Sequence, residues 1–482
     1  MSSHERATQQ GPSRAAVFAL VATGVFISTL DGSIVNVSLH AIAEHFGVVV
    51  GPLLSWVVLA YLVVTAALLL TVGRLADLLG HRVIWTLGLA VFSAGSALCA
   101  WAPSLRWLIA ARAFQGTGGA LLMANGPALL LTAFPPSQRG RALGLHAVVV
   151  GVGVSSGPVL GGLITERLGF RAIFYLNLPF GILGALLAWR TLPRVAPKSV
   201  HFDGFGALWL ALALGTLTSG LSLGGELGFA AAPPVVLLAS SCVSFWRLVR
   251  HEQRHPHPIL DLSLFREPVF RTALVSLTLS FLASYALSFL LPLFLHQLRG
   301  LSLAQTGWLL TPLPLTIALL SPFSGALSDR VGTRSFAAFG MLLLSAGLAI
   351  LSALGPDTPL SLVIFALLVA GVGQAIFRAP NNSALMGAAP SHRQGVASSL
   401  LATARVIGQS LSVAVASTIF GLSGSARAGR LLAQPPVGLD IAGAQRTFLI
   451  GYRCALWTMA TVALLAALSA WTTHAQTRSA LR

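Results

Sequence analysis

Long apolar runs alternate with short polar segments along the whole chain. A hydrocarbon core of ~30 Å requires about 20 predominantly apolar residues per helix, and about fourteen runs approach that length. They lie near residues 15–39, 53–73, 83–102, 105–131, 141–165, 172–191, 204–223, 233–249, 269–295, 305–327, 335–354, 359–380, 395–421 and 453–473. The pattern predicts an all-α polytopic membrane protein with about 14 spans.

The composition supports a membrane protein. Of the 482 residues, 55% are hydrophobic and 9% are charged, whereas a soluble domain carries about 25% charged residues. Such an apolar surplus exceeds what a soluble core can bury, so we expect it to face membrane lipids. The net charge of +17 would also suit a nucleic-acid partner. The basic residues form no continuous stripe, however, and no nucleic-acid binding is expected.

The distribution of positive charge predicts the orientation. The first apolar run is too long for the apolar part of a signal peptide, and no small-residue cleavage site follows it. With the N-terminus inside, most Lys and Arg residues fall on the inner side of the predicted spans. This predicts a multi-pass protein of the cell (plasma or inner) membrane with both termini in the cytoplasm.

Two predicted inner loops share the pattern G-x-x-x-D-x-x-G-x-R. The first contains Gly73, Asp77, Gly80 and Arg82, and the second contains Gly325, Asp329, Arg330, Gly332 and Arg334. We expect the glycines to permit tight turns. We expect the two Asp side chains to lie near helix N-termini of the opposite half and to close the inner side.

The repeated loops predict two six-helix halves. The predicted segments are a cytoplasmic tail at 1–14, the N-terminal half at 15–198, an inserted helix pair at 199–250, a cytoplasmic linker at 251–268, the C-terminal half at 269–473 and a second cytoplasmic tail at 474–482. The inserted pair is expected at the periphery of the bundle.

The paired loops resemble the inner-loop signature of the major facilitator superfamily. Residues 29–37 resemble the first-span signature of its fourteen-span drug:proton antiporters, and residues 112–120 resemble its fourth-span arginine motif. Residues 153–162 are similar to its fifth-span antiporter motif. Leu78 departs from the pattern, because the family usually carries a basic residue there.

This resemblance implies a proton-coupled exporter of hydrophobic small molecules, of the multidrug-efflux type, that works by alternating access as a monomer. A dedicated exporter of one natural product, lipid or peptide is an alternative. A membrane sensor without transport is a third reading, which the intact loops and buried charges argue against.

Asp31 and Arg112 are the expected proton-coupling residues. Asp31 lies about 17 residues, roughly 25 Å, from the inner end of its span, and Arg112 lies at a similar depth. A charge inside the bilayer costs at least ~2.5 kcal/mol, so each needs a partner or a water-filled cavity. We expect a switchable pair, in which Asp31 loses its proton near Arg112 and binds one when the two separate. A capping acid and a purely structural ion pair are the alternatives.

Several polar side chains are candidates for a substrate cavity: Asn36, Gln115, Asn125, Gln374 and Arg405. Arg405 is also a candidate for packing or gating. The spans contain one clear acid, Asp31, against two bases, Arg112 and Arg405. The expected substrate is therefore hydrophobic and monocationic or neutral, and anions stay open.

The fifth-span motif is expected to govern helix movement. Pro158 removes a backbone donor and favours a kink. Small residues on one face permit close helix approach, and the motif supplies Gly153, Gly157, Gly161 and Gly162.

The sequence predicts no cofactor and no catalysis. It contains no Walker loop and no nucleophile–base constellation, so the proton motive force is the expected energy source rather than ATP. His251, His255 and His257 offer metal-ligating side chains, but the prolines between them favour a solvated linker, and no metal site is expected.

Overall fold

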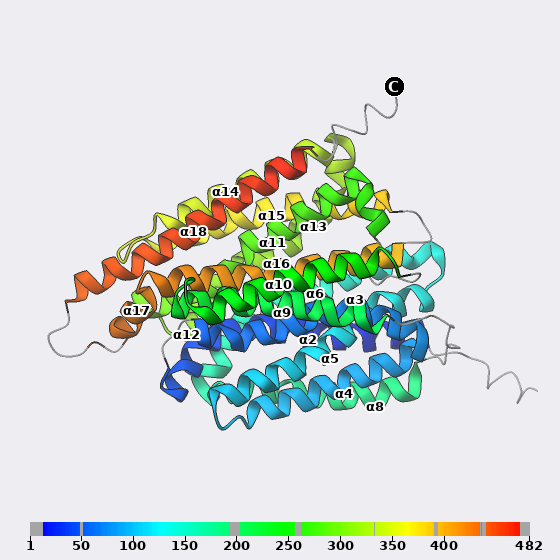
Figure 1. Cartoon of the computed structure of the whole chain (residues 1–482), viewed down its shortest axis with the longest axis horizontal. Coiled ribbons are helices and arrows are strands. Elements are labelled where there is room, and N and C mark those ends of the chain that lie inside the picture. Colours follow the sequence, from blue (N-terminus) through cyan, green and yellow to red (C-terminus); the bar gives the residue numbers. More distant parts are fainter. Residues whose placement is uncertain are drawn as a thin grey trace, which may run out of the picture.

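Long, roughly aligned helices make up the computed structural model of the chain (Figure 1). The structure describes residues 13–48, 52–192, 203–255, 262–331, 333–389, 394–433, 435 and 440–472. Within this part of the chain every regular element is a helix and none is a strand. The prediction of an all-helical protein is confirmed.

Helices α2 to α10 cover the first part of the chain. Their bounds are α2 (Arg14–Phe46), α3 (Pro52–Leu79), α4 (His81–Ala100), α5 (Leu105–Ala133), α6 (Pro136–Leu168), α7 (Arg171–Tyr175), α8 (Asn177–Thr191), α9 (Gly204–Leu227) and α10 (Ala232–Glu252).

The remaining helical elements begin with a short 3-10 helix, η2. They are η2 (Leu262–Arg266), α11 (Pro268–Leu293), η3 (Phe294–Leu298), α12 (Leu303–Leu310), α13 (Pro312–Val331), α14 (Thr333–Ser352), α15 (Leu360–Ala388), α16 (Gln394–Leu422), α17 (Ser425–Ala433) and α18 (Ile441–Thr472).

Breaks divide two of the predicted runs, and the run near 172–191 is split into α7 and α8 at Leu176. The run near 305–327 is split into α12 and α13 at Thr311, which Pro312 and Pro314 follow. Proline lacks a backbone N–H and so favours such a break. Within the described residues, twelve helices are long and apolar enough to cross a membrane, with α7–α8 and α12–α13 each taken as one. Helices α3 and α5 are not among these twelve.

Local signals fix several helix ends. The Ser13 hydroxyl accepts a hydrogen bond from the Ala16 N–H at the start of α2, as N-cap residues do. Gly47 ends the same helix with φ 65°, a left-handed conformation that favours glycine. Ser302 and Gln305 form a reciprocal capping box at the start of α12.

Helices α2 to α8 pack with one another, and so do α11 to α18 (Figure 1). The two groups meet along two seams. One seam lies between α6 and the α12–α13 pair, and the other lies between α3 and α16. Helix α9 covers this second seam, where the Thr418 hydroxyl of α16 donates to the Leu221 carbonyl of α9 at 2.9 Å. Helix α10 lies outside α9 and holds it through a Ser241–Ala213 hydrogen bond.

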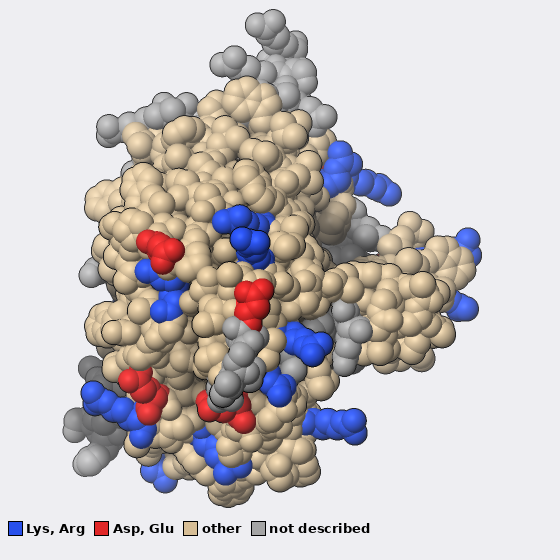
Figure 2. Space-filling view, turned by 90° about the vertical axis from the view of Figure 1, so that its left-hand side faces the viewer, with Lys and Arg blue, Asp and Glu red and all other residues tan. Residues whose placement is uncertain are grey.

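The bundle has two distinct ends. We call the end where α2 begins and α18 ends the tail end. There Ser469 of α18 donates to the Thr272 carbonyl near the start of α11. At the opposite, far end, the Ala304 N–H donates to the Glu166 carboxylate at 2.9 Å and joins α12 to α6. Figure 2 views the far end, where acidic and basic side chains lie scattered among other residues.

The outward faces of the peripheral helices are apolar. On α8, Ile182, Leu183, Leu186 and Leu187 are all more than half exposed, and Phe323 of α13 is 72% exposed. Contiguous apolar surface of this extent mismatches water but suits lipid tails. The apolar surplus of the composition therefore lies where a bilayer would contact it.

Candidate functional site

A buried ion pair joins Asp31 of α2 to Arg112 of α5. The Arg112 Nη1 lies 2.5 Å from the Asp31 Oδ2, and the two side chains are 1% and 0% exposed. Their similar depth along two neighbouring helices is what the sequence predicted. The structure thus brings the expected pair together, and its role in proton coupling stays a prediction.

Polar partners complete the coordination of the Asp31 carboxylate. Its Oδ1 accepts hydrogen bonds from the Gln115 amide at 3.0 Å and from the Asn177 amide at 2.9 Å. Ser96 of α4 accepts from the Asn177 amide in turn. A buried carboxylate needs its lone pairs satisfied, and these contacts supply the donors for Asp31.

Arg112 extends the cluster to α3. Its Nε donates to the Val57 carbonyl at 2.9 Å, and its guanidinium lies 4.5 Å from the centroid of the Tyr61 ring. The Gln115 carbonyl accepts from Arg112 Nη1 at 2.7 Å. The cluster therefore links α2, α3, α4, α5 and α8, with Asp31 bonded directly to α5 and α8 and indirectly to α3 and α4.

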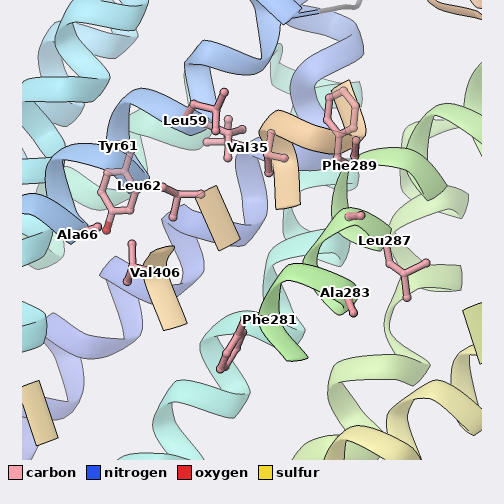
Figure 3. Close-up of a cluster of buried hydrophobic side chains, with 14 of the residues drawn as sticks. Val35, Leu59, Tyr61, Leu62, Ala66, Phe281, Ala283, Leu287, Phe289 and Val406 are labelled. Carbon is pink, nitrogen blue, oxygen red and sulfur yellow. The ribbon is translucent and has the colours of Figure 1, made fainter. Parts of the chain in front are cut away.

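A cavity of about 200 Å³ lies beside this cluster, between the two halves. It is lined from the first half by α2, α3, α5 and α6, and from the second by α11, α12, α13, α15 and α16. Figure 3 shows Tyr61 and Leu62 on α3 together with Val406 on α16 and Phe281 on α11. These four residues belong to the cavity wall.

Tyr61 and Gly32 connect the cavity with the ion pair. The Tyr61 ring faces the Arg112 guanidinium, and Tyr61 also lines the cavity. Gly32 follows Asp31 directly, and its carbonyl accepts a hydrogen bond from the Tyr285 hydroxyl of α11 at 2.9 Å. The cavity wall therefore includes residues that adjoin both members of the pair.

Three of the five predicted cavity residues do line the cavity: Asn36, Gln374 and Arg405. The Asn36 amide lies 3.4 Å from the Tyr285 hydroxyl. Gln115 and Asn125 lie outside the cavity, contrary to the prediction, because each bonds elsewhere. Gln115 bonds the ion pair, and Asn125 bonds the ring and the carbonyl of His81 at the start of α4.

Arg378 is a cavity residue that the sequence analysis did not name as a candidate. The helix continues through Pro380 to Ala388, so Arg378 lies within α15 and faces the cavity. Its Nε donates to the Gln374 carbonyl at 2.7 Å. The four-residue spacing of Gln374 and Arg378, which puts both on one helix face, was the available signal.

Asn177, Ser96, Tyr61 and Tyr285 were also missed as site residues. Asn177 begins α8 and falls in a stretch, residues 174–181, that resembles a landmark of the fourteen-span branch. Its contact with Asp31 joins segments 146 positions apart. No sequence pattern within either helix reports such a contact.

The glycines of the fifth-span motif lie at close helix contacts. A Cβ built on Gly153, Gly157 or Gly161 would come within 2.8 Å of atoms of α2. Gly162 instead faces the other half, where an added Cβ would lie 2.2 Å from the Leu303 carbonyl of α12. Pro158 lies inside α6, and its carbonyl approaches Gly307. The motif thus holds α6 against α2 and also against α12 at the far end.

The repeated loop motif is described only in part. Gly73 lies within α3, and Gly80 adopts φ 88° in the turn between α3 and α4, as the predicted tight turn requires. Arg82 donates to the Trp189 carbonyl of α8 and lies over the Trp189 ring. Gly332 and the surroundings of Asp77, Gly325, Asp329, Arg330 and Arg334 lie outside the described part of the chain. The closing role of the loops stays a prediction.

Asp203 brings two of the linker histidines together. Its Oδ1 caps the Gly206 N–H at the start of α9 and lies 2.7 Å from the His251 Nε2. The His255 Nδ1 lies 3.8 Å from its Oδ2. His251 belongs to α10 rather than to a linker, and its hydrogen bond fastens the end of α10 to the start of α9. His257 lies outside the described residues.

Two packed groups of long apolar helices around a largely apolar central cavity that contains a few polar side chains define a multi-pass membrane transporter. Residues 21–413 match the sequence profile of the Major Facilitator Superfamily, and the chain belongs to this family. The chain is therefore a transporter and not an enzyme, as predicted.

Curated relatives place the chain near drug exporters. It is 35% identical over 412 residues to the riboflavin transporter RibZ of Clostridioides difficile, covering 84% of this chain and 88% of that protein. It is 33% identical over 413 residues to the multidrug resistance protein Stp of Mycobacterium tuberculosis, covering 84% and 76%. The tetracenomycin C resistance and export protein of Streptomyces glaucescens is 29% identical, with 82% and 74% covered. The predicted resemblance to the drug-efflux type is confirmed.

Solved structures share the fold. A bacterial homologue of the human lysosomal transporter Spinster, in an inward-facing and unoccupied conformation, matches with a TM-score of 0.70 at 17% identity, covering 95% of this chain and 96% of that one. This likeness supports the architecture of two packed helical groups.

Proposed function

We propose that the chain is a proton-coupled exporter of hydrophobic small molecules that works by alternating access. It uses the proton motive force and no cofactor, and acts as a monomer in the plasma membrane. Its partners are protons, membrane lipids and the exported molecule. The observation that carries the proposal is the buried Asp31–Arg112 pair at 2.5 Å, next to the central cavity.

The geometry supports a coupling cycle. In this state the Asp31 carboxylate accepts hydrogen bonds from Arg112, Gln115 and Asn177. Movement of α5 or α3 that withdraws Arg112 leaves a buried charge uncompensated, so Asp31 then binds a proton. Because Tyr61 contacts both Arg112 and the cavity, substrate entry and proton exchange act on the same side chain.

Closed contacts at the far end fit the inward-open half of such a cycle. The close approach of Gly162 to Leu303 and the Glu166–Ala304 hydrogen bond hold α6 against α12. The rings of His40 on α2 and His296 in η3 lie 4.3 Å apart at the same end. Opening toward the far end would require these contacts to separate while the tail end closes.

We further propose fourteen spans with both termini in the cytoplasm. Helices α3 and α5 are 28 and 29 residues long and pack against helices that belong to the twelve candidate spans. A helix of 20 residues already spans about 30 Å. With these two included, the chain crosses the membrane fourteen times and both termini lie on one side, and the excess of Lys and Arg in the predicted inner segments favours the cytoplasm for that side.

Cysteine labelling tests this topology. In a background where Cys99, Cys242 and Cys454 are replaced by Ser, we expect Phe202→Cys to react with an impermeant maleimide only from the cytoplasmic side. Ala230→Cys, in the turn between α9 and α10, is the matched control and should react only from outside. Labelling of Phe202→Cys from outside intact cells would overturn the topology.

A vesicle experiment tests the proposed function. Inverted membrane vesicles that contain the protein are energised to acidify their lumen and given rhodamine 6G, ethidium or fluorescein. We expect at least one dye to accumulate and to dissipate part of the pH gradient, and both effects to vanish with a protonophore. Accumulation that persists without a proton gradient would contradict proton coupling.

Movement of none of these dyes would favour a dedicated exporter. Two of the relatives are named for a single compound, riboflavin or tetracenomycin C. On the same fold, narrow specificity requires several fixed polar partners, and Asn36, Gln374, Arg378 and Tyr285 provide them here.

A further inference from the structure

The charged side chains that the structure describes in the lining of the central cavity are all positive. Its lining includes two arginines, Arg378 of α15 and Arg405 of α16. No Asp or Glu among the described residues lines it. A guanidinium cannot lose its proton in a protein, so within this part of the chain the cavity wall carries two fixed positive charges and no fixed negative charge.

Arg405 lacks a counter-ion among the residues that the structure describes. Within the described part of the chain, no carboxylate forms an ion pair with Arg405, and its guanidinium donates no hydrogen bond. It lies well inside α16, which begins at Gln394. A charge at such a depth must be paired or solvated within a cavity. The donors of Arg405 are therefore available to a molecule that enters.

Arg378 is only partly satisfied. Its Nε donates to the Gln374 carbonyl at 2.7 Å, and its guanidinium lies 4.6 Å from the centroid of the Phe281 ring. Neither of its terminal nitrogens donates to an acceptor among the described residues. Arg405 acts electrostatically on Arg378, so the two cations repel one another in a setting that screens charge poorly.

Asp31 does not neutralise these arginines in this state. Its carboxylate is fully buried outside the cavity and is occupied by Arg112, Gln115 and Asn177. The expectation of a monocationic substrate counted Asp31 as part of the cavity and omitted Arg378. The placement of both residues reverses that balance.

We propose that the central cavity binds amphiphilic organic anions. The carboxylate or sulfonate of such a molecule takes the place of the missing acid between Arg378 and Arg405, since planar guanidinium groups pair well with carboxylates. Its apolar body packs on the lining side chains Met123, Val150, Val154, Leu310, Leu313 and Ile317. This inference rests on the proposed export function and names the class of molecule that the same cavity takes.

Equilibrium binding to the purified full-length protein in detergent tests the inference. Fluorescein and rhodamine 123 share a three-ring body but carry opposite charge at pH 7.5. We expect fluorescein to bind about 10- to 100-fold more tightly than rhodamine 123. A gain in affinity of this size is what charge-assisted hydrogen bonds between an anion and the two arginines would provide. Equal binding, or tighter binding of rhodamine 123, would overturn the proposal.

Substitutions of the two cavity arginines test whether these residues cause the preference for fluorescein. Arg405→Gln and Arg378→Gln should each weaken fluorescein binding about tenfold or more, without weakening rhodamine 123 binding. Arg405→Lys keeps the charge and should retain most of the preference, which separates lost charge from a misfolded cavity. Arg250→Gln, on the exposed end of α10, is the matched control and should change neither affinity. A fluorescein preference that survives both cavity substitutions would also overturn the proposal.

The binding and vesicle experiments distinguish failure of the anion-site proposal from failure of the proton-coupling proposal. If fluorescein binds through the two arginines but no dye moves protons in vesicles, the anion site stands and the proton-coupled function falls. If rhodamine 6G is driven by the proton gradient and fluorescein does not bind, the function stands and the anion site falls.

Discussion

Replacement of Asp31 by Asn should abolish uphill dye accumulation in energised vesicles, to the level of vesicles without the protein. Asn nearly preserves the shape of the side chain but cannot exchange a proton, so the coupling step is lost. Arg112 keeps its bonds to the Val57 carbonyl and the Gln115 carbonyl, which should hold the local packing together. Downhill exchange of dye across the membrane should persist.

Two controls accompany this variant. Asp31→Glu retains a titratable group and should keep part of the uphill transport. Asp357→Asn makes the same chemical change at an exposed position outside the cluster and should have no effect. Full uphill transport by Asp31→Asn would show that another group carries the proton.

Removal of Arg112 should have the largest effect on stability. Arg112→Met leaves the Asp31 carboxylate buried without its counter-ion, and the loss of one partner of a buried pair typically costs about 3–5 kcal/mol of unfolding free energy. The double variant Asp31→Asn/Arg112→Met removes both charges and should recover most of that loss. Reversible unfolding in mixed detergent measures the three variants and the unsubstituted protein.

A control variant separates the energy of the ion pair from the effect of removing an arginine side chain. Arg250→Met, at an exposed position of α10, should stay within about 0.5 kcal/mol of the unsubstituted protein. If the double variant is as unstable as the sum of the two single variants, the residues do not interact energetically.

Hydropathy and residue counting correctly predicted how deep Asp31 and Arg112 lie along their helices. The position of a residue along a span follows from its distance to the span ends at 1.5 Å per residue. Asp31 and Arg112 were therefore paired correctly from two separate helices, and every predicted span has a helical counterpart in the described chain.

The same reasoning could not predict rotation about the helix axis. Packing against neighbours sets which face of a helix looks inward, and a single sequence does not contain those neighbours. Gln115 was therefore predicted in the cavity, although it faces Asp31. Asn177 was missed for the same reason, because only the packing of α8 against α2 brings it to the carboxylate.

Arg378 shows a different limit. The predicted span ends near residue 380, and Pro380 follows Arg378 closely, where a proline usually disrupts a helix. In the structure α15 continues, and the Asn381 amide donates to the Ala273 carbonyl of α11 at 3.0 Å just after the proline. A membrane helix tolerates an internal proline when neighbouring helices supply such contacts.

Proton movement driven by a substrate gradient tests the central claim most directly. Proteoliposomes are loaded with a dye that the vesicle experiment shows to be transported, with equal pH on both sides and with the membrane potential clamped. We expect downhill dye movement through the unsubstituted protein to drive protons in the opposite direction. We expect Asp31→Asn to move dye without protons. Equal proton flux through both proteins would contradict the assignment of proton coupling to Asp31.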